Sequence, residues 1–407
     1  MGIAPTRRRR SGEETGRPTL SLFVEARFAR DETGGWGAMD PTSGAGTWRR
    51  YARGGVALRL VARAKRRTEP GLAALDGTAT VAPLPYYLGL RGLVPALPRL
   101  AAAITGEVAR AEVVLLRLPG VVPLLAAAAC RLLRRTYSVE VVGDPVAVLT
   151  SGALGRPGRA LAPLARWQMR TAVGGAAAAL YVTGSTLQCS YPHRAGAVAV
   201  SVSGARLGDD AFRDGGRRWQ PGPVRILTIG SQELPYKGHD VLLRALHRMR
   251  VDGVDARAVI VGGGRTHAQL VDLAESLGVG DAVVFTGAVH DRSRLLELLD
   301  EASLFALPSL TEGLPRALLE AMARALPAVG SDVGGIPELL DGRWLVPAGD
   351  PSALAGAMTA LAADRSEWEA QSLRNLRTAR RYSSDVLDAR FTEWLGALPR
   401  ARGEAGR

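Results

Sequence analysis

Cysteine is scarce in this chain of 407 residues, which contains only Cys130 and Cys189. Two cysteines are too few for the disulfide framework of a small secreted domain or for a multi-cysteine metal cluster. Both lie in apolar stretches, so we predict two buried thiols, no disulfide framework and no metal site. A reducing compartment fits this composition, and we expect a cytoplasmic protein.

Long uninterrupted apolar runs are also absent. The most apolar stretch, residues 113–133, is broken by Arg117, two prolines and a glycine, so it cannot form one bilayer-spanning helix. Arg7 to Arg10 resemble the charged start of a signal peptide, but polar residues follow where an apolar region is needed. We therefore predict no transmembrane span and a disordered basic tail over residues 1–17.

Acidic residues are few in the first half of the chain. Residues 1–200 contain 27 Lys and Arg against 12 Asp and Glu, whereas residues 201–407 contain 25 against 27. A basic half favours anionic partners such as phosphorylated substrates or an anionic membrane surface, and biased coding toward arginine is the alternative explanation. We expect no nucleic-acid partner, because the sequence has no recognition module and no interleaving of aromatic and basic residues.

Lysine is the rarest cation. Of the 52 basic residues, only Lys65 and Lys237 are lysines. Lysine binds phosphate as a compact point charge, whereas arginine binds it as a planar fork. Lys65 lies in a run of arginines and is expected to be solvated. Lys237 precedes Gly238 in a predicted loop, which makes it a candidate phosphate ligand.

Short runs rich in Val, Ile and Leu alternate with longer helical patterns throughout the chain. This alternation is typical of a parallel sheet covered by helices on both faces. Because 407 residues exceed the size of one hydrophobic core, we predict two Rossmann-like, doubly wound α/β domains that face each other across a cleft. The predicted strands are residues 20–24, 56–61, 80–83, 113–117, 139–142, 179–182, 224–229, 258–261, 282–286, 304–307, 328–330 and 344–346.

The predicted boundaries follow changes in composition. A polar, Gly-rich stretch over residues 207–223 separates the two βα arrays and is interpreted as a linker. The remaining segments are an N-terminal domain (18–206), a C-terminal domain (224–382), a C-terminal helix packing back toward the N-terminal domain (383–398) and a tail (399–407).

Two carboxylates follow the strand that ends at Leu307. Glu312 lies in the loop after this strand, Pro315 suits the first position of a helix, and Glu320 lies inside that helix. A helix N-terminus also offers free N–H groups to an anion. The alternative is that both are ordinary surface residues, Glu312 on a loop and Glu320 on an amphipathic helix. The apolar residues around Glu320 argue against it, because a carboxylate there needs a partner.

This Glu-x7-Glu pattern resembles the signature of the family-4 retaining glycosyltransferases, which have the GT-B fold. Four further motifs occur in the family's order. The strand ending at Gly230 leads to Tyr236 to Asp240, then Gly262 to Gly264 and Phe285 to Gly287 follow before the signature, and Gly334 to Glu338 comes after it. The resemblance implies that Glu320 binds ribose hydroxyls, Glu312 the donor sugar and Lys237 the diphosphate. It implies a donor site made of Gly230, Ser231, Lys237, Gly263, Gly287, Glu312, Gly313, Leu314, Pro315, Leu319 and Glu320.

The predicted chemistry needs no metal or other cofactor beyond a nucleotide-sugar donor of the UDP or GDP type. Negative charge builds on the leaving diphosphate, and an ammonium with free helix N–H groups stabilises that charge. The sequence contains no Asp-x-Asp motif of metal-dependent sugar transfer. Retention of configuration is implied by the resemblance alone.

The chain departs from the family pattern at two positions, and its N-terminal half resembles the family only in architecture. Ser231 stands where the family usually has an arginine, and Arg265 or Arg206 is a candidate replacement. The strand that usually ends near a histidine is followed here by Asp144, a third candidate catalytic residue beside Glu312 and Lys237. The alternative is that Asp144 only caps a helix. Residues 26–51 are predicted to form a long loop whose Trp and Arg side chains grip a sugar or phosphate, or are simply mobile.

The sequence therefore predicts a hexosyltransferase in polysaccharide or glycoconjugate biosynthesis, with a glycan, lipid-linked or small-molecule acceptor. Peripheral attachment to the inner membrane face would suit the basic N-terminal half. A phosphorylase or disaccharide-phosphate synthase has the same fold. The alternative outside enzymes is a catalytically degenerate, nucleotide-sugar-binding partner subunit.

Overall fold

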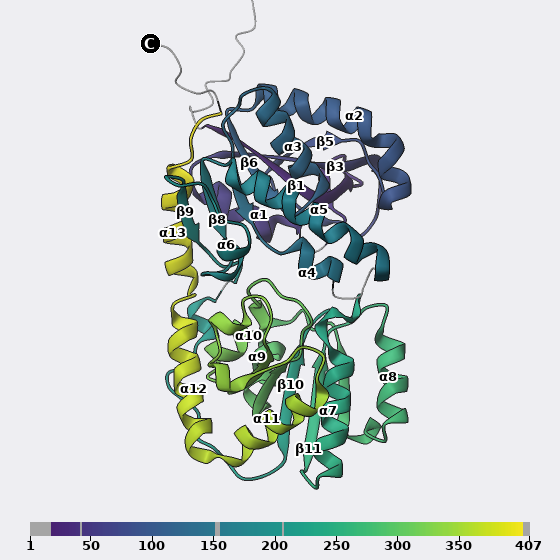
Figure 1. The fold of residues 1–407 in the computed structure, drawn as a ribbon, viewed down its shortest axis with the longest axis vertical. Helices are drawn as coiled ribbons and strands as arrows, with labels where there is room; N and C mark the ends of the chain where they lie inside the picture. The colour runs from purple at the N-terminus through teal and green to yellow at the C-terminus, as the bar shows by residue number, and fades with distance from the viewer. Residues whose placement is uncertain (1–17, 41–42, 151–154, 206, 402–407) are drawn as a thin grey trace, which may run out of the picture.

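The computed structural model describes residues 18–40, 43–150, 155–205 and 207–401, so the predicted N-terminal tail and residues 402–407 lie outside the described residues. Two sheets form two α/β domains, one above the other in Figure 1. Each sheet has its helices on both faces. Within the described residues no helix is both long and apolar enough to cross a membrane.

Within the described residues the N-terminal sheet has nine strands. The pairs that join β1, β3, β5, β6, β7, β8 and β9 are all parallel, whereas β2 pairs antiparallel with β1 and β4. Its spatial order is β4-β2-β1-β6-β7-β8-β9, while β3 pairs with β1 and β5. The strands are β1 (Thr19–Arg30), β2 (Trp36–Ala38), β3 (Ala57–Thr68), β4 (Ala73–Ala74), β5 (Thr80–Leu84), β6 (Val113–Leu118), β7 (Ser138–Val141), β8 (Ala178–Tyr181) and β9 (Val198–Ser201).

Six helices belong to the N-terminal domain. Helices α2, α3 and α5 cover one face of its sheet, and α1 packs on the other face with the C-terminal helix α13. Their bounds are α1 (Ala45–Arg53), α2 (Gly89–Arg110), α3 (Val121–Leu132), α4 (Pro145–Thr150), α5 (Gly155–Gly174) and α6 (Thr186–Ser190).

The C-terminal sheet has six parallel strands in the order β12-β11-β10-β13-β14-β15. Its strands are β10 (Val224–Ile229), β11 (Ala256–Val261), β12 (Val283–Gly287), β13 (Leu304–Leu307), β14 (Ala328–Ser331) and β15 (Leu345–Val346). The helices that follow are α7 (His239–Val251), α8 (His267–Ser276), α9 (Arg292–Glu301), α10 (Arg316–Ala323), α11 (Pro351–Ala363), α12 (Arg365–Arg380) and α13 (Ser384–Gly396).

The loop predicted over residues 26–51 is wrong for most of its length. Strand β1 continues to Arg30, β2 returns antiparallel to it, and α1 begins at Ala45. Trp48 is 2% exposed, and the guanidinium carbon of Arg50 lies 3.8 Å from the ring centroid of Phe391 in α13. These side chains therefore hold the C-terminal helix rather than a ligand.

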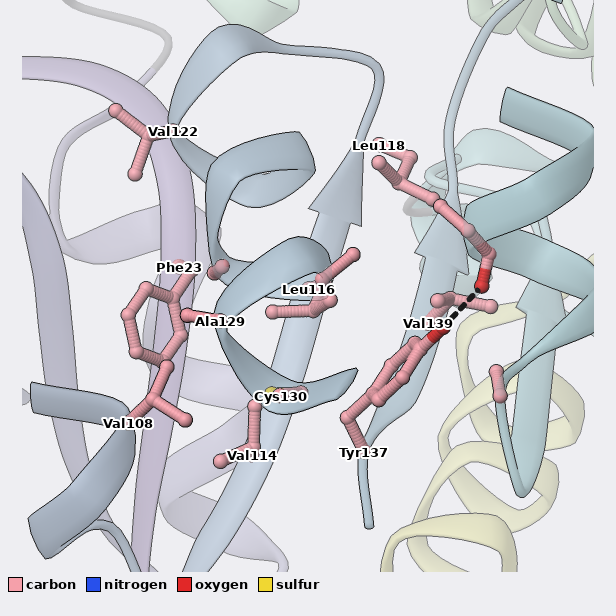
Figure 2. Close-up of a cluster of buried hydrophobic side chains, with 14 of the residues drawn as sticks. Phe23, Val108, Val114, Leu116, Leu118, Val122, Ala129, Cys130, Tyr137 and Val139 are labelled. Carbon is pink, nitrogen blue, oxygen red and sulfur yellow. Dashed lines mark hydrogen bonds between the residues drawn. The ribbon is translucent and has the colours of Figure 1, made fainter. Parts of the chain in front are cut away.

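One buried cluster surrounds Cys130, between α3 and strands β1, β6 and β7 (Figure 2). Tyr137 lies beside it, and its hydroxyl donates a 2.9 Å hydrogen bond to the carbonyl oxygen of Ala172. Burial raises the pKa of the Cys130 thiol to about 12. Cys189 is exposed instead, so the prediction of two buried thiols is correct only for Cys130.

The chain crosses between the domains twice, and the two crossings lie side by side. Leu207 and Ser383 form a parallel bridge, and the amide of Ser384 donates to the carbonyl oxygen of Leu207 at 2.8 Å. After the second crossing, α13 packs on the N-terminal sheet, as Figure 1 shows. The buried Ala401 then forms two backbone hydrogen bonds with that domain, one to the carbonyl of Glu112 and one from the amide of Thr136.

The segment predicted as a linker is closely packed on the C-terminal domain. The guanidinium of Arg217 donates to the carbonyl oxygens of Leu299, Ala302 and Arg324 at 2.7–2.8 Å. Trp219 packs against the core of the same domain. A Gly-rich composition thus marks the boundary, while arginine and tryptophan fix the segment to one side of it.

The different environments of the two cysteines predict a two-step thiol titration. We expect one thiol per native chain to react with a disulfide reagent at pH 8, because only Cys189 is exposed and Cys130 remains protonated. Guanidinium chloride should release the second thiol. Cys189→Ser should abolish the native reaction and leave the denatured one; two fast native thiols would contradict the packing around Cys130.

Candidate functional site

The carboxyl ends of the two parallel sheets face each other, and a pocket of about 290 Å³ lies between the domains. Gly143, Asp144 and Val148 line it from the N-terminal side, and it is completed by Leu234, Tyr236, Lys237, Thr311, Glu312 and Gly313. A Cβ added to Gly313 would lie 3.2 Å from the carbonyl oxygen of Val142. Glycine therefore lets the loop before α10 approach the opposite domain.

Lys237 and Glu312, both predicted site residues, form an ion pair at the centre of this pocket. The Lys237 Nζ atom lies 2.6 Å from Glu312 Oε1, and their side chains are only 20% and 8% exposed. The hydroxyl of Ser309 donates to the same carboxylate oxygen at 2.8 Å. Sequence reasoning missed Ser309, whose position before the predicted Glu-x7-Glu pattern was the available signal.

Backbone contacts place these two loops against each other. Gly238 adopts the left-handed conformation (φ 68°), and a Cβ there would lie 2.0 Å from the carbonyl oxygen of Pro308. The amide of Leu310 donates to the carbonyl oxygen of Tyr236 at 2.7 Å. Only glycine fits at position 238, and this close approach sets the separation of Lys237 and Glu312.

Glu320 lies on α10, which begins at Arg316, with Pro315 as its extended N-cap residue rather than its first helical residue. Its side chain is partly buried, and within the described residues no hydrogen bond or ion pair holds its carboxylate. Burial raises the pKa of Glu320, and the charges of Arg316 and Arg292 partly offset that effect. A partly buried carboxylate without a protein partner is suited to accept hydrogen bonds from ligand hydroxyls.

Glycines bring the loops after β10, β11 and β12 close together. The amide of Gly262 donates to the carbonyl oxygen of Gly287 at 2.8 Å. A Cβ at Gly262 would lie 1.9 Å from the carbonyl oxygen of Gly230. The predicted residues Gly230, Gly263 and Gly287 therefore share one edge of the sheet, where backbone groups can approach a ligand directly.

His239 is buried at the start of α7. A Cβ at Gly230 would lie 3.4 Å from its Nε2 atom, which has no hydrogen-bond partner within the described residues. Burial and the neighbouring Lys237 charge lower the pKa of His239 to about 4. The imidazole is therefore neutral at physiological pH.

Asp144 lies across the pocket from Lys237 and also caps a helix. Its Oδ1 atom accepts a 2.8 Å hydrogen bond from the amide of Val146 in α4 and another from the hydroxyl of Tyr191. Burial and the carboxylate raise the pKa of Tyr191, so it remains a donor. Asp144 therefore caps α4, as the alternative predicts, and it also lines the pocket, so one role does not exclude the other.

Ser231, the position that lacks the family's arginine, and Arg265, one of the two candidate replacements, both lie at the surface. Ser231 is exposed, and its hydroxyl accepts a hydrogen bond from the amide of Glu233. Arg265 pairs with Glu233 at 2.9 Å on the exposed rim. Arg206, the other candidate, lies outside the described residues.

Three predicted donor-site residues lie in or against the core. Leu319 is fully buried, Leu314 is 8% exposed, and Pro315 is buried beside them. The side chain of Leu319 packs with the hydrophobic core below α10. It therefore positions the helix, and only the backbone atoms of Leu314, Pro315 and Leu319 are available to a ligand.

Glu338 is a residue whose role the sequence did not indicate, although it ends the motif that begins at Gly334. Its carboxylate accepts hydrogen bonds from the amides of Ser185 (2.9 Å) and Thr186 (2.7 Å) in the opposite domain. The hydroxyl of Thr186 (2.6 Å) and the amide of Gly184 also donate to it. Burial alone would raise the pKa of Glu338, but these hydrogen bonds hold it below its ordinary value.

Comparisons with known proteins relate the chain to glycosyltransferases. Residues 223–364 match the family model described as glycosyl transferases group 1. The chain is 28% identical to protein CapJ of Staphylococcus aureus over 262 residues, which span 64% of this chain and 65% of CapJ. It is 37% identical to the amylovoran biosynthesis glycosyltransferase AmsK of Erwinia amylovora over 148 residues, 34% of this chain and 36% of AmsK.

The chain thus spans less than two thirds of the length of these relatives. Among solved structures, HepE of Anabaena in complex with UDP superposes with a TM-score of 0.64 at 16% identity, covering 94% of this chain and 100% of HepE. At that identity the likeness concerns the fold alone. The predicted two-domain GT-B fold is confirmed.

Replacing Glu338 tests its contact between the domains. We expect Glu338→Gln to destabilise the protein by about 1–3 kcal/mol at pH 7, because a charged acceptor of several hydrogen bonds is lost. A carboxylate whose pKa is lower in the folded than in the unfolded protein stabilises the fold. This stabilisation is complete above the unfolded pKa of about 4.3 and is lost as the pH falls through the folded pKa. The difference in melting temperature from wild type should therefore shrink on acidification below about pH 4.3.

The matched control is Glu297→Gln, which replaces a largely exposed carboxylate on α9. It should shift the melting temperature little at either pH. Equal effects of the two substitutions at pH 7 would contradict a specific role for Glu338.

Proposed function

We propose that this chain, which carries a glycosyl transferases group 1 domain over residues 223–364, is a retaining glycosyltransferase. The C-terminal domain holds a nucleoside-diphosphate-hexose donor, and the sugar passes to an acceptor on the N-terminal side of the pocket. The name of AmsK supports a place in polysaccharide or glycoconjugate biosynthesis. The acceptor is a glycan, a lipid-linked glycan or a small molecule.

The observation that carries this proposal is the arrangement of the two glutamates of the Glu-x7-Glu pattern. Glu312 is paired with Lys237 in the pocket, whereas Glu320 is partly buried one helical segment away without a protein partner in the described chain. A sugar nucleotide has hydroxyls on both its ribose and its hexose, with a diphosphate between them. The carboxylates of Glu320 and Glu312 can accept hydrogen bonds from the ribose and hexose hydroxyls, and the ammonium of Lys237 can bind the diphosphate between them.

The chemical step follows from the same residues. When the anomeric bond breaks, charge develops on the leaving diphosphate, and the Lys237 ammonium with the N–H groups that begin α10 stabilises it. Binding of the diphosphate to Lys237 frees Glu312 to accept hydrogen bonds from the hexose hydroxyls. The acceptor oxygen bonds to the anomeric carbon on the face that the diphosphate leaves, and the acceptor proton passes to the leaving diphosphate oxygen. Asp144, held by Tyr191 and Val146, lies on the acceptor side and accepts a hydrogen bond from a hydroxyl of the hexose or of the acceptor. This scheme needs no metal, and an assay with EDTA tests that point.

Ser231 favours the second candidate, a degenerate subunit that binds sugar nucleotides without transferring the sugar. The site has lost the cation expected there, and Arg265 is engaged with Glu233. Binding of the nucleotide without any release or transfer of sugar would support this alternative.

A thermal-shift screen with UDP, GDP, ADP and their hexose conjugates, with and without EDTA, tests the donor site. A ligand at about 100 times its dissociation constant adds roughly 2.7 kcal/mol to the folded state. One nucleotide should stabilise the wild type and fail to stabilise Glu320→Ala, while Glu297→Ala should respond like the wild type. No shift with any nucleotide would remove the basis of the proposal.

Substitution of Lys237 tests the chemical step. We expect Lys237→Met to lower kcat for sugar release or transfer about 100-fold or more, because it removes the fixed charge beside the leaving group. Lys237→Arg keeps the charge but replaces a point charge by a planar fork, and should retain part of the rate. Steady-state kinetics with the nucleotide found in the screen measure both; an unchanged kcat in Lys237→Met would contradict the role of Lys237.

A further inference from the structure

Helix α5 exposes a row of large apolar side chains. Leu161 is 47% exposed, Leu164 is 50% exposed and Trp167 is 62% exposed. Their three-residue spacing places them along one side of the helix. Ala162, Met169 and Val173 are buried on the other side, and Met169 and Val173 belong to the core that packs on the sheet. Because the inner side already packs on the core, the outer apolar row is surplus to folding and suggests a surface for a partner.

Arginines accompany this row. Arg159, Arg166 and Arg170 are exposed along the adjoining side of the same helix, and the Nε atom of Arg170 donates a 2.9 Å hydrogen bond to the carbonyl oxygen of Ser190. Residues 145–208 contain six arginines and no Asp or Glu, so no acidic side chain of this segment neutralises the helix. We define the α5 face as Leu161, Leu164 and Trp167 with Arg159, Arg166 and Arg170.

Neighbouring helices continue the same chemistry. Helix α3 packs between α2 and α5 on one face of the sheet (Figure 1). At the end of α3, Leu132 is 78% exposed beside the exposed Arg131. Near the start of α2, Val94 is 70% exposed and Arg91 is also exposed. Apolar and cationic side chains are therefore mixed across this helical layer.

We propose that the α5 face docks on the surface of an anionic lipid bilayer. Leucine side chains insert at the boundary of headgroups and acyl chains, and a tryptophan is favoured at that depth because its ring is amphipathic. The arginine guanidinium groups bind lipid phosphates, and each basic residue near an anionic surface strengthens binding about fivefold. A mixed apolar and cationic face without acidic residues matches this partner.

A second copy of the chain fits the face less well. In a twofold dimer the same patch meets itself, so the arginine rows of the two copies would lie close together without acidic partners. Like charges facing each other oppose association. Charge complementarity therefore selects the lipid surface over self-association.

The position of the face connects it with the pocket. Helix α4 packs against α5, and it begins directly after Asp144. Val148 of α4 lines the pocket and is 46% exposed. If the proposed function holds, an acceptor anchored in the bilayer reaches the pocket along α4, which deepens that proposal toward a lipid-linked acceptor. The docking of the α5 face itself does not depend on the reaction.

Vesicle sedimentation tests the docking with the full chain. The probes are vesicles of phosphatidylcholine alone and vesicles with 30% phosphatidylglycerol. We expect binding to the anionic vesicles that weakens as salt rises from about 0.1 to 0.5 M. Substituting Arg159→Glu, Arg166→Glu and Arg170→Glu together should weaken binding at least 100-fold, since three fivefold contributions are lost and repulsion replaces them.

Matched controls separate the face from net charge and overall hydropathy. Arg365→Glu, Arg377→Glu and Arg380→Glu together change the net charge equally on exposed positions of α12 and should leave most of the binding intact. Leu164→Asp with Trp167→Asp should reduce binding at least tenfold. Val251→Asp with Leu373→Asp, at exposed positions of the other domain, should not.

The outcomes are decisive in both directions. Equal loss in the α5 and α12 arginine variants would overturn the proposal, because net charge alone would then explain binding. Conversion of a dimer to a monomer by Trp167→Asp in light scattering, without vesicle binding by the wild type, would replace the bilayer by a second copy. Each variant should retain the nucleotide-induced thermal shift of the wild type, so failure of the docking and failure of the proposed function are distinguishable.

Discussion

The contact of Glu338 with the start of α6 is the interaction on which the rest of the site depends. One carboxylate of the C-terminal domain satisfies the first amides of a helix in the N-terminal domain. The parallel sheets are thereby held with their carboxyl edges opposed, so that the loop carrying Glu312 and Gly313 meets the loop carrying Asp144. A carboxylate at a helix start is a favourable and directional contact.

Local pattern was sufficient for the core of this fold. The strands that end at Ile229, Val261 and Leu307 were predictable because buried parallel strands are continuous apolar runs. Strand β9 (Val198–Ser201) was missed because it has only 4 residues, none of which is buried. The region from Ala26 to Tyr51 was mistaken for a loop, because its tryptophan and arginine pack on α13, which lies about 340 residues later in the sequence.

The candidate site divides in the same way. The Glu-x7-Glu pattern identifies Glu312 and Glu320 because the two positions are fixed by a single loop and helix. The partners of these groups come from elsewhere: Lys237 reaches Glu312 across 75 positions, and Tyr191 reaches Asp144 across 47. Such pairs have no periodicity, so one sequence does not reveal them. The excess of basic residues in the N-terminal half is evident from the composition. Where these residues and the apolar side chains of α5 reach the surface is known only from the structure.

The double crossing at Leu207 and Ser383 makes the C-terminal domain an insertion within the N-terminal one, since α13 and Ala401 return to the first sheet. Two crossings joined by a bridge hold the domains more closely than one flexible tether, whose ends wander over a distance that grows with its length. Phe391 and Trp394 of α13 are part of the same buried core as residues of β1 and β3. The core of the N-terminal domain is therefore completed only once α13 has been synthesised, after the whole C-terminal domain.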